Sequence, residues 1–177
     1  MPTTSNVSAQ DDLYERAVAE FATSLGRLVR GYEADAEKRR DLLQEVHLAL
    51  WRSFKGFDER CSLRTWVYRV AHNTAISWVI RQKRAGPQML SLEELDALPA
   101  PQDVNHADRR SALDRLTQLI QRLKPMDRQV ILAWLEGMDA VAIGELTGLS
   151  GSNVATKVHR IKTLLARNFN AGGPHAK

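Results

Sequence analysis

The chain has 177 residues, of which 44% are hydrophobic and 26% charged, and its formal net charge is +4. This is the composition of an ordinary globular protein with enough chain for one or two domains. The single cysteine, Cys61, excludes an internal disulfide framework and fits a reducing compartment. The first residues lack the features of a secretory signal, and no segment reaches the roughly 20 apolar residues that span a bilayer. We therefore expect a cytoplasmic protein with no membrane insertion.

The charges are distributed unevenly along the chain. Residues 61–84 carry five basic side chains and no acid, residues 85–107 carry four acids and no Lys or Arg, and residues 146–177 carry five basic side chains and no acid. Two basic blocks separated by an acidic segment indicate two contacts with a polyanion. A pair of solvated helical faces would give the same charges, and this alternative stays open.

The first half of the chain has the apolar spacing of helices. We expect helices in 13–32 and 35–54, a connection at 55–62 and a further helix from Ser62, and four mutually packed helices fit these runs. The last helix should bury one apolar face and leave Tyr68 and His72 pointing elsewhere. The residues expected on that face are Leu63, Trp66, Val67, Val70, Ala71, Thr74 and Trp78.

The middle of the chain is rich in proline and acids. Three of the six prolines lie in 86–107, where they break any long helix, so we expect an interdomain linker in which 90–98 forms at most a short helical turn. A helix should resume at Arg109 and end at Lys124, and Pro125 should open another that ends near Gly137. No stretch shows the alternation of a strand. We predict an all-α protein of two small helical domains joined by a flexible acidic linker, with the domains at 10–84 and 109–170 and the linker at 85–108.

Residues 139–165 have the spacing of a helix–turn–helix. Asp139 is placed to cap a helix with Val141, Ile143 and Leu146 as its apolar residues, Gly148 suits a left-handed turn, and Ser150 is placed to cap the next helix. That helix has a buried stripe of Val154, Val158, Ile161 and Leu165. Its other face carries short hydrogen-bonding groups followed by cations, an order that suits base edges with phosphates beside them. The candidate DNA contacts are Ser152, Asn153, Thr156, Lys157, His159 and Arg160. Helical hairpins that never meet DNA also show such patterns.

The sequence contains no catalytic constellation. Its five histidines are scattered without metal-ligand spacing, and it has neither a phosphate-binding glycine loop nor a nucleophile motif. We therefore expect no enzyme activity, no cofactor and no metal site.

Four runs of the sequence resemble the extracytoplasmic-function group of bacterial sigma factors, the promoter-specificity subunits of RNA polymerase. They are RDLLQEVHLALWRSF, CSLRTWVYRVAHNTAISWVIRQKR, LKPMDRQVILAWLEG and AIGELTGLSGSNVATKVHRIK. The resemblance implies an alternative sigma factor that directs core RNA polymerase to specific promoters and assists their melting at initiation. It implies that 10–84 binds core polymerase and the −10 element, and that 109–170 binds the −35 element. The implied partners are core RNA polymerase, promoter DNA and an anti-sigma factor.

The resemblance also assigns residues to these contacts. The core polymerase contacts would be Asp41, Gln44, Glu45 and Leu48. The −10 contacts would be Lys55, Arg64, Arg69, Asn73, Arg81, Lys83 and Arg84, where the cations hold phosphates and Asn73, with the loop Phe57–Ser62, receives a flipped base. In the recognition helix the family often has Lys or Arg where this chain has Ala155, so the sequence does not predict which promoter is read.

The aromatic residues of 64–84 and the cysteine have more than one interpretation. Core packing is the favoured role of Trp66 and Trp78 because they share the apolar stripe. Tyr68 lies off that stripe and is the better exposed candidate, although packing at the helix edge is the alternative. For Cys61 an inert thiol is favoured over a redox sensor.

Two other classes of protein compete with the sigma factor. One is a stand-alone helix–turn–helix transcriptional regulator whose first half serves in dimerisation or sensing. The other is a helical interaction module whose basic residues only aid solubility.

Overall fold

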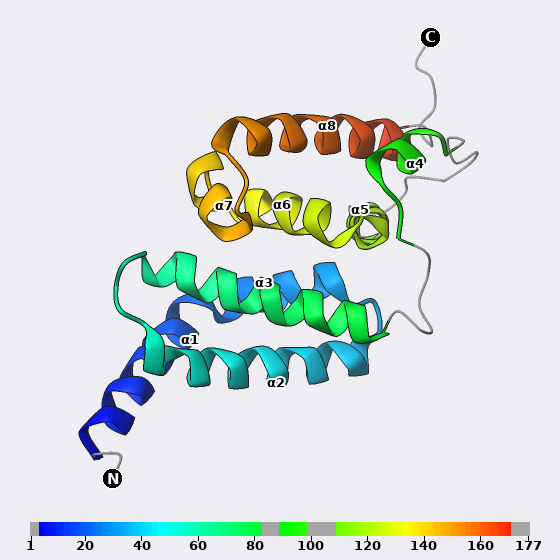
Figure 1. Cartoon of the computed structure of the whole chain (residues 1–177). Coiled ribbons are helices and arrows are strands. Elements are labelled where there is room, and N and C mark those ends of the chain that lie inside the picture. Colours follow the sequence, from blue (N-terminus) through cyan, green and yellow to red (C-terminus); the bar gives the residue numbers. More distant parts are fainter. Residues whose placement is uncertain (1–3, 83–88, 99–108, 171–177) are drawn as a thin grey trace. The chain divides into compact units, whose positions relative to one another are not determined.

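The structure is a computed structural model that describes residues 4–82, 89–98 and 109–170. The chain forms two compact units, Met1–Ala85 and Gly86–Lys177 (Figure 1). Over the described residues the elements are helical, and the β-type pairing consists of one isolated bridge between Leu90 and Leu123. The predicted all-α fold is confirmed.

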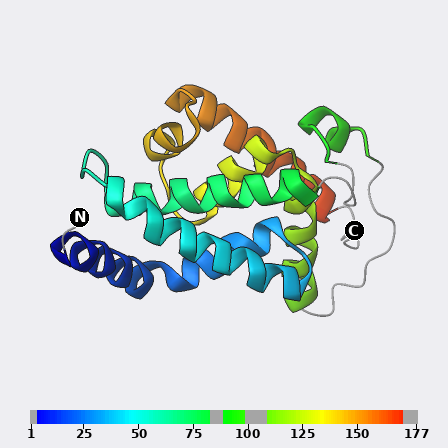
Figure 2. The same ribbon diagram turned by 60° about the horizontal axis from the view of Figure 1, so that its bottom comes forward.

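In the first unit each α-helix packs against the other two. They are α1 (Thr4–Tyr32), α2 (Ala36–Ser53), the 3-10 turn η1 (Phe54–Gly56) and α3 (Leu63–Gln82), and α3 contacts both α1 and α2 (Figures 1 and 2). The described part of this unit therefore has three α-helices and a short turn where the sequence suggested four helices. Its buried hydrophobic side chains come from all of these elements: Ala17, Phe21, Leu25, Leu28, Val29, Tyr32, Leu42, Val46, Leu50, Phe54, Val67, Tyr68, Ala71, Ala75 and Trp78.

The buried face of α3 differs from the expected one. Tyr68 is only 2% exposed and His72 is fully buried, so the expectation that Tyr68 points to solvent was wrong. The Tyr68 ring packs edge-on against Phe21 at 6.1 Å, and the Tyr32 hydroxyl hydrogen-bonds His72 Nδ1 at 2.8 Å. Because α3 packs against two helices, it buries a wider arc than the single stripe that the apolar spacing suggests.

The two tryptophans of α3 share the packing role that the spacing favours. Trp78 is buried, and its indole N–H donates to Glu33 Oε2 at 3.1 Å. Trp66 is half-buried, and its indole N–H donates to Ser53 Oγ at 2.9 Å. Each ring therefore places its apolar part in the unit and satisfies its one polar atom, as a partly buried tryptophan requires.

The second unit is built around its last helix. Its elements are α4 (Leu92–Asp96), α5 (Arg109–Arg122), α6 (Pro125–Leu135), α7 (Ala140–Thr147) and α8 (Gly151–Asn170), and α8 contacts each of the other four. Pro125 opens α6 as expected, and Gly137 follows its end with a φ of 78°. The buried hydrophobic side chains are Leu90, Leu92, Leu95, Ile120, Leu123, Val130, Ile131, Leu132, Ala133, Met138, Ile143, Leu146, Val154, Val158, Ile161, Leu164 and Leu165.

Part of the predicted linker belongs to this second unit. The backbone of Leu90 receives an N–H from Lys124 at 3.0 Å and donates its own N–H to Arg122 at 2.7 Å. Leu92 and Leu95 are buried one turn apart on α4. The proline and charge content predicted a single linker over 85–108, but 89–98 packs onto the second unit. Its leucines form an apolar face that the other helices of the unit cover.

Candidate nucleic-acid interface

The helices α7 and α8 are joined by a short turn whose geometry depends on glycine. Asp139 caps α7 by accepting the Ala142 N–H at 2.8 Å, and Ser150 Oγ accepts the Asn153 N–H at 3.3 Å at the start of α8. Between them Gly148 has a φ of 78°, the left-handed conformation that favours glycine. A Cβ on Gly144 would lie 2.7 Å from the Leu149 carbonyl oxygen, so α7 and the turn approach closely. A helix, a short glycine-containing turn and a second helix are the parts of a helix–turn–helix.

The two faces of α8 divide largely as the spacing predicts. Val154, Val158, Ile161 and Leu165 are buried. The candidate DNA contacts on the other face are exposed, with one exception: Ser152, Asn153, Thr156, His159 and Arg160 are exposed, and Lys157 is half-buried. In α7, Ile143 and Leu146 are buried as expected, whereas Val141 is 68% exposed and takes no part in the core.

Two candidate cations of α8 make ion pairs inside the unit. Lys157 Nζ lies 2.6 Å from Asp127 Oδ1, and Asp127 on α6 is nearly buried. Arg160 Nη2 lies 2.8 Å from Glu93 Oε1 on α4. The pKa of Glu93 is lowered, first by a hydrogen bond from its own backbone N–H and then by the hydrogen bond and charge of Arg160. Sequence reasoning missed Asp127 and Glu93, because both pairs join residues far apart in the chain.

The first unit places several of its candidate DNA-binding cations over aromatic rings. The Lys55 ammonium lies 5.8 Å from the Trp51 ring centroid, the Arg64 guanidinium 5.8 Å from that of Tyr68, and the Arg81 guanidinium 5.9 Å from that of Trp78. Such contacts contribute about 0.5–1 kcal/mol each at exposed sites. The aromatic side chains therefore serve the unit as core residues and as supports that orient cations toward solvent.

The remaining candidates of α3 do not share one face. Arg69 and Asn73 lie one turn apart on the outer side of the helix, and Asn73 is exposed. Arg64 is five residues before Arg69, about 140° around the helix axis at 3.6 residues per turn. The structure thus brings Arg69 and Asn73 together and sets Arg64 apart from them. The predicted contacts Lys83 and Arg84 lie outside the described residues.

The loop before α3 is held at its base by aromatic packing. The Phe57 ring lies 5.3 Å from the Trp66 ring, and the Arg60 side chain pairs with Asp58 at 2.7 Å. Glu59 has a φ of 59°, a left-handed conformation that is uncommon outside glycine. Asn73 lies ten residues into α3, roughly 15 Å along the helix from the end of this loop at 1.5 Å per residue. Cys61 is half-buried in the loop.

The candidate polymerase contacts form one row on α2. Asp41, Gln44 and Leu48 are exposed and follow one another at helical spacing, and Leu48 is a large apolar side chain with 46% exposure. Glu45 is half-exposed and pairs with Arg81 of α3 at 2.5 Å. Glu45, a predicted polymerase contact, thus forms an ion pair with Arg81, a predicted DNA contact.

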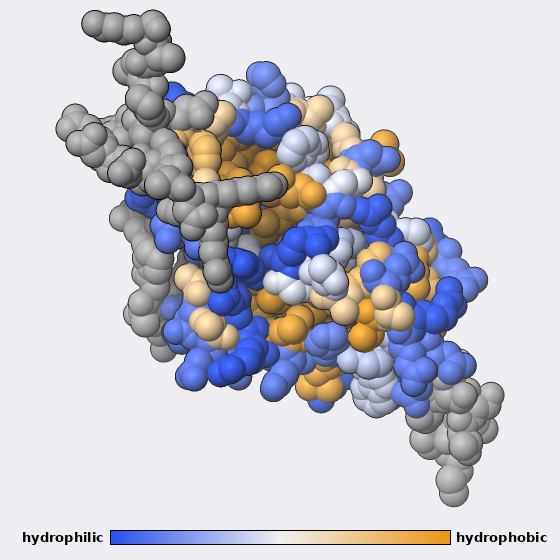
Figure 3. All heavy atoms as spheres, turned by 180° about the vertical axis from the view of Figure 1, so that it is seen from behind, coloured by the Kyte–Doolittle hydropathy of each residue, from blue (hydrophilic) through white to orange (hydrophobic). Residues whose placement is uncertain are grey.

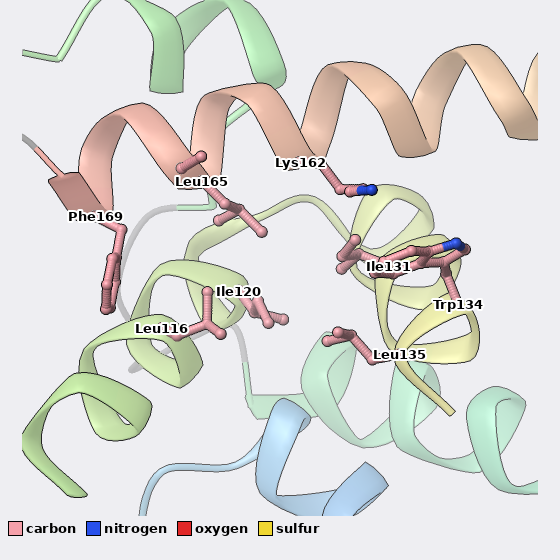
Figure 4. Close-up of a pocket in the computed structure, with 9 residues that line it drawn as sticks. Leu116, Ile120, Ile131, Trp134, Leu135, Lys162, Leu165 and Phe169 are labelled. Carbon is pink, nitrogen blue, oxygen red and sulfur yellow. The ribbon is translucent and has the colours of Figure 1, made fainter. Parts of the chain in front are cut away.

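An apolar groove lies within the second unit, among α5, α6 and α8. Its volume is about 290 Å³, and its lining includes Ile120, Trp134, Leu135 and Phe169 (Figure 4). Apolar side chains gather in a hollow in the upper part of the face shown in Figure 3. The Lys162 ammonium lies 4.4 Å from the Trp134 ring centroid at the rim. Sequence reasoning did not find this groove, because its residues come from three helices that the fold brings together.

The described residues contain no cluster of three or more His, Cys, Asp or Glu that could hold a metal ion. Among the described helices, none combines the length and the apolar character needed to cross a membrane.

Comparison with known proteins agrees with these features. Residues 14–85 match the family Sigma-70 region 2. The chain is 32% identical over 155 residues to the RNA polymerase sigma factor CarQ of Myxococcus xanthus, covering 86% of this chain and 84% of CarQ. It is 29% identical over 146 residues to the ECF RNA polymerase sigma factor SigX of Bacillus subtilis, covering 76% and 72% of the two chains.

A solved structure supports the fold. The sigma factor RpoE, in complex with the anti-sigma factor NepR from Bartonella quintana, superposes with a TM-score of 0.66 at 15% identity, covering 89% of this chain and 96% of RpoE. The family itself is shown by the sequences: with the match to region 2 and the likeness to CarQ and SigX, the chain belongs to the extracytoplasmic-function group of RNA polymerase sigma factors.

Proposed function

We propose that this alternative sigma factor binds core RNA polymerase and the −10 element through its first unit and the −35 element through its second unit. As an alternative sigma factor it directs core polymerase to specific promoters and assists their melting at initiation. The main support for −35 binding by the second unit is the exposed polar face of α8. This face follows a glycine turn and begins with short hydrogen-bonding side chains. Such a face fits the major groove.

The proposed −10 contact uses cations that are already oriented. Separating DNA strands costs about 1.4 kcal/mol per base-pair step, and a protein without ATP recovers this cost by binding the opened strand. Lys55, Arg64 and Arg81 lie over aromatic rings and are exposed. They are suited to phosphates, and Asn73 on the outer face of α3 is suited to a flipped base.

The proposed polymerase contact is the row Asp41, Gln44, Glu45 and Leu48 on α2. Leu48 adds an exposed apolar side chain to this polar row, and an apolar contact within a polar rim suits a protein interface. We propose that the chain acts as a binding subunit and that the polymerase performs the chemistry. Its place of action is then the cytoplasm, where the polymerase and the DNA are.

We also propose that an anti-sigma factor binds this chain and that the groove among α5, α6 and α8 receives an apolar segment of it. The groove has an apolar floor and a cationic rim at Lys162, which fits an amphipathic helix with acidic flanks. The RpoE structure provides a related protein that is bound to an anti-sigma factor. We expect an anti-sigma factor that co-purifies with the chain to be lost in Leu135→Asp and kept in Val141→Asp, because Leu135 lines the groove and Val141 does not.

Run-off transcription tests the main proposal. Genomic fragments are transcribed with core polymerase alone, with this chain alone and with both together, and the free chain is tested for binding to the fragments that are transcribed. We expect transcripts from a small set of fragments only when both proteins are present, and weak duplex binding by the chain alone. Tight binding to one duplex without polymerase, and no transcription when polymerase is added, would instead identify a stand-alone regulator.

A further inference from the structure

The short helix α4 carries a compact acidic group on the second unit. Glu93, Glu94 and Asp96 lie within five residues, and a capping box orders the start of the helix. Ser91 Oγ accepts the Glu94 N–H at 3.2 Å, and the Glu94 carboxylate accepts the Ser91 N–H at 2.7 Å. Glu94 thus serves the helix itself, which leaves Glu93 and Asp96 as its outward acids.

Apolar packing holds α4 in place on the unit. Leu95 is fully buried, Leu92 is 4% exposed, and the backbone of Leu90 is bridged to the segment between α5 and α6. A helix of five residues has no stability of its own, so this burial is what keeps it folded. The backbone that bears Glu93 and Asp96 is therefore fixed on the unit. Only their side chains need to become ordered when they contact α8.

The partners of the two acids lie on one side of the proposed recognition helix. Glu93 pairs with Arg160 at 2.8 Å, and Asp96 pairs with Arg167, which also donates to the Asp96 carbonyl oxygen. Arg160 and Arg167 are seven residues apart, which is about two turns and places them on the same side of α8. Glu93 and Asp96 are three residues apart on one side of α4. Two acids thus meet two arginines across a helix–helix contact.

We propose that α4 is an internal competitor of DNA: Glu93 and Asp96 hold Arg160 and Arg167 in the free protein and are displaced when DNA phosphates bind these arginines. This inference rests on the proposed role of α8 in DNA binding. All four side chains remain about half exposed or more, so an incoming phosphate can reach them. The contact lowers the affinity of the free chain for any duplex, because each bound phosphate must first replace a carboxylate.

The size of the effect follows from the exposure of the pairs. Exposed ion pairs are weak, so their removal should tighten DNA binding about threefold to tenfold for the two together at low salt. The salt dependence is a second and sharper signature. Salt weakens the carboxylate–arginine pairs of the free wild type as well as its contact with DNA, so log K should fall more steeply with log salt in a variant without these pairs, by at most about 0.9 per arginine.

Binding of the free full-length chain to a labelled 25-base-pair duplex of random sequence, between 50 and 200 mM KCl, tests the proposal. The variant Glu93→Gln/Asp96→Asn keeps the leucines and the capping box. Its matched control, Glu15→Gln/Glu20→Gln, removes two exposed acids from α1 of the first unit. We expect tighter binding and a steeper slope in the first variant and wild-type values in the control. Unchanged affinity and slope, or equal gains in both variants, would overturn the proposal.

A second comparison keeps the test valid if Glu93→Gln/Asp96→Asn loosens the unit. In an Arg160→Gln background, adding Glu93→Gln should give no gain in affinity, because the arginine that it would release is absent. A full gain in that background would overturn the proposal.

The same proteins are then assayed with core polymerase in run-off transcription. If none of them, wild type included, initiates at any promoter, the proposed function fails, and the random duplex still reports on α4. If the wild-type chain initiates transcription, and Glu93→Gln/Asp96→Asn binds the random duplex with the same affinity and salt slope as wild type, only the inference about α4 fails.

Discussion

Lys157 holds a nearly buried carboxylate from a position predicted to contact DNA. Its ammonium lies 2.6 Å from Asp127, whereas Arg160, three residues further along α8, makes an ion pair with about half of its side chain exposed. Removing one partner of a shielded pair leaves the other unpaired, while exposed pairs contribute little to stability. The two cations should therefore differ in what their loss changes.

Lys157→Ala should lower the free energy of unfolding of the second unit by about 1–3 kcal/mol, because Asp127 loses its partner. Arg160→Ala should change stability by about 0.5 kcal/mol or less and weaken promoter binding by about 1–3 kcal/mol. Hydrogen–deuterium exchange of the α6 and α8 amides in urea measures the stability of the second unit, and promoter binding by the holoenzyme measures the other effect. Equal stability losses in both variants would contradict the assignment of Lys157 as a structural residue.

Asn73 allows a test of the −10 contact at a single side chain. It is exposed on the outer face of α3, so Asn73→Ala should leave the fold intact and impair strand opening more than −35 binding. Permanganate reactivity of unpaired thymines measures opening, and binding of a −35 duplex measures the other contact. Ser77→Ala, exposed one turn further along α3, is the control and should open the promoter like wild type. Equal losses in opening and in −35 binding would reject the assignment.

At the scale of elements, the sequence predicts single helices better than their contacts. The caps Asp139 and Ser150, the first-turn Pro125 and the left-handed Gly148 were all predictable, because each follows from local backbone chemistry. The burial of Tyr68 was not, because it depends on α3 packing against two helices at once. The packing of 89–98 onto the second unit was also not predicted. The prolines and acids of this region indicated a linker, although its leucines are the residues that pack.

The close approach of α7 and the turn is testable with one methyl group. In Gly144→Ala the new Cβ would lie 2.7 Å from the Leu149 carbonyl oxygen, so the turn must shift, and we expect a loss of about 1–3 kcal/mol. Gly26→Ala is the matched control, since it is also a helical glycine and a Cβ there meets nothing within 4 Å. It should stabilise the first unit by about 0.5–1 kcal/mol. Thermal unfolding measures both, and a neutral Gly144→Ala would contradict the contact.

The contact of α1 with α2 should depend on pH through His47. Burial lowers the pKa of His47 below 6.5, and its Nδ1 lies 3.0 Å from the Tyr14 hydroxyl. The unfolded chain then binds the proton more tightly than the folded one. The stabilisation is therefore present above pH 6.5 and is lost as the pH falls through the window from 6.5 down to the folded-state pKa.

We expect the first unit to lose less stability between pH 7.5 and pH 5.5 in His47→Gln than in the parent chain. A Trp134→Phe background makes the fluorescence specific, since Trp51, Trp66 and Trp78 all lie in the first unit. The control His159→Gln lies in the second unit. A parent chain and a His47→Gln variant with the same pH dependence would contradict the role of His47.

At the scale of the whole molecule, the proposed function requires surfaces on both units to act together with polymerase. The row on α2 is the proposed polymerase contact, and Leu48 is its exposed apolar side chain. Leu48→Asp should lower the affinity for core polymerase by about 1–2 kcal/mol, because the new carboxylate would lose water at the interface without gaining a partner. Ile80→Asp places the same charge at an exposed apolar position on α3 and is the control. Competition with labelled wild-type chain for core polymerase measures both, and equal losses would reject the α2 surface.

The contact between α4 and α8 also bears on how the free protein is distributed in a cell. The acids of α4 are always beside the two arginines, whereas non-specific DNA binds proteins with Kd values of about 10⁻⁴–10⁻⁶ M and must displace these acids first. A genome offers about 10⁶–10⁹ such sites, so even a threefold penalty applied to each of them moves molecules from bulk DNA into the free pool. Two carboxylates on a five-residue helix would thereby keep this sigma factor available to the polymerase.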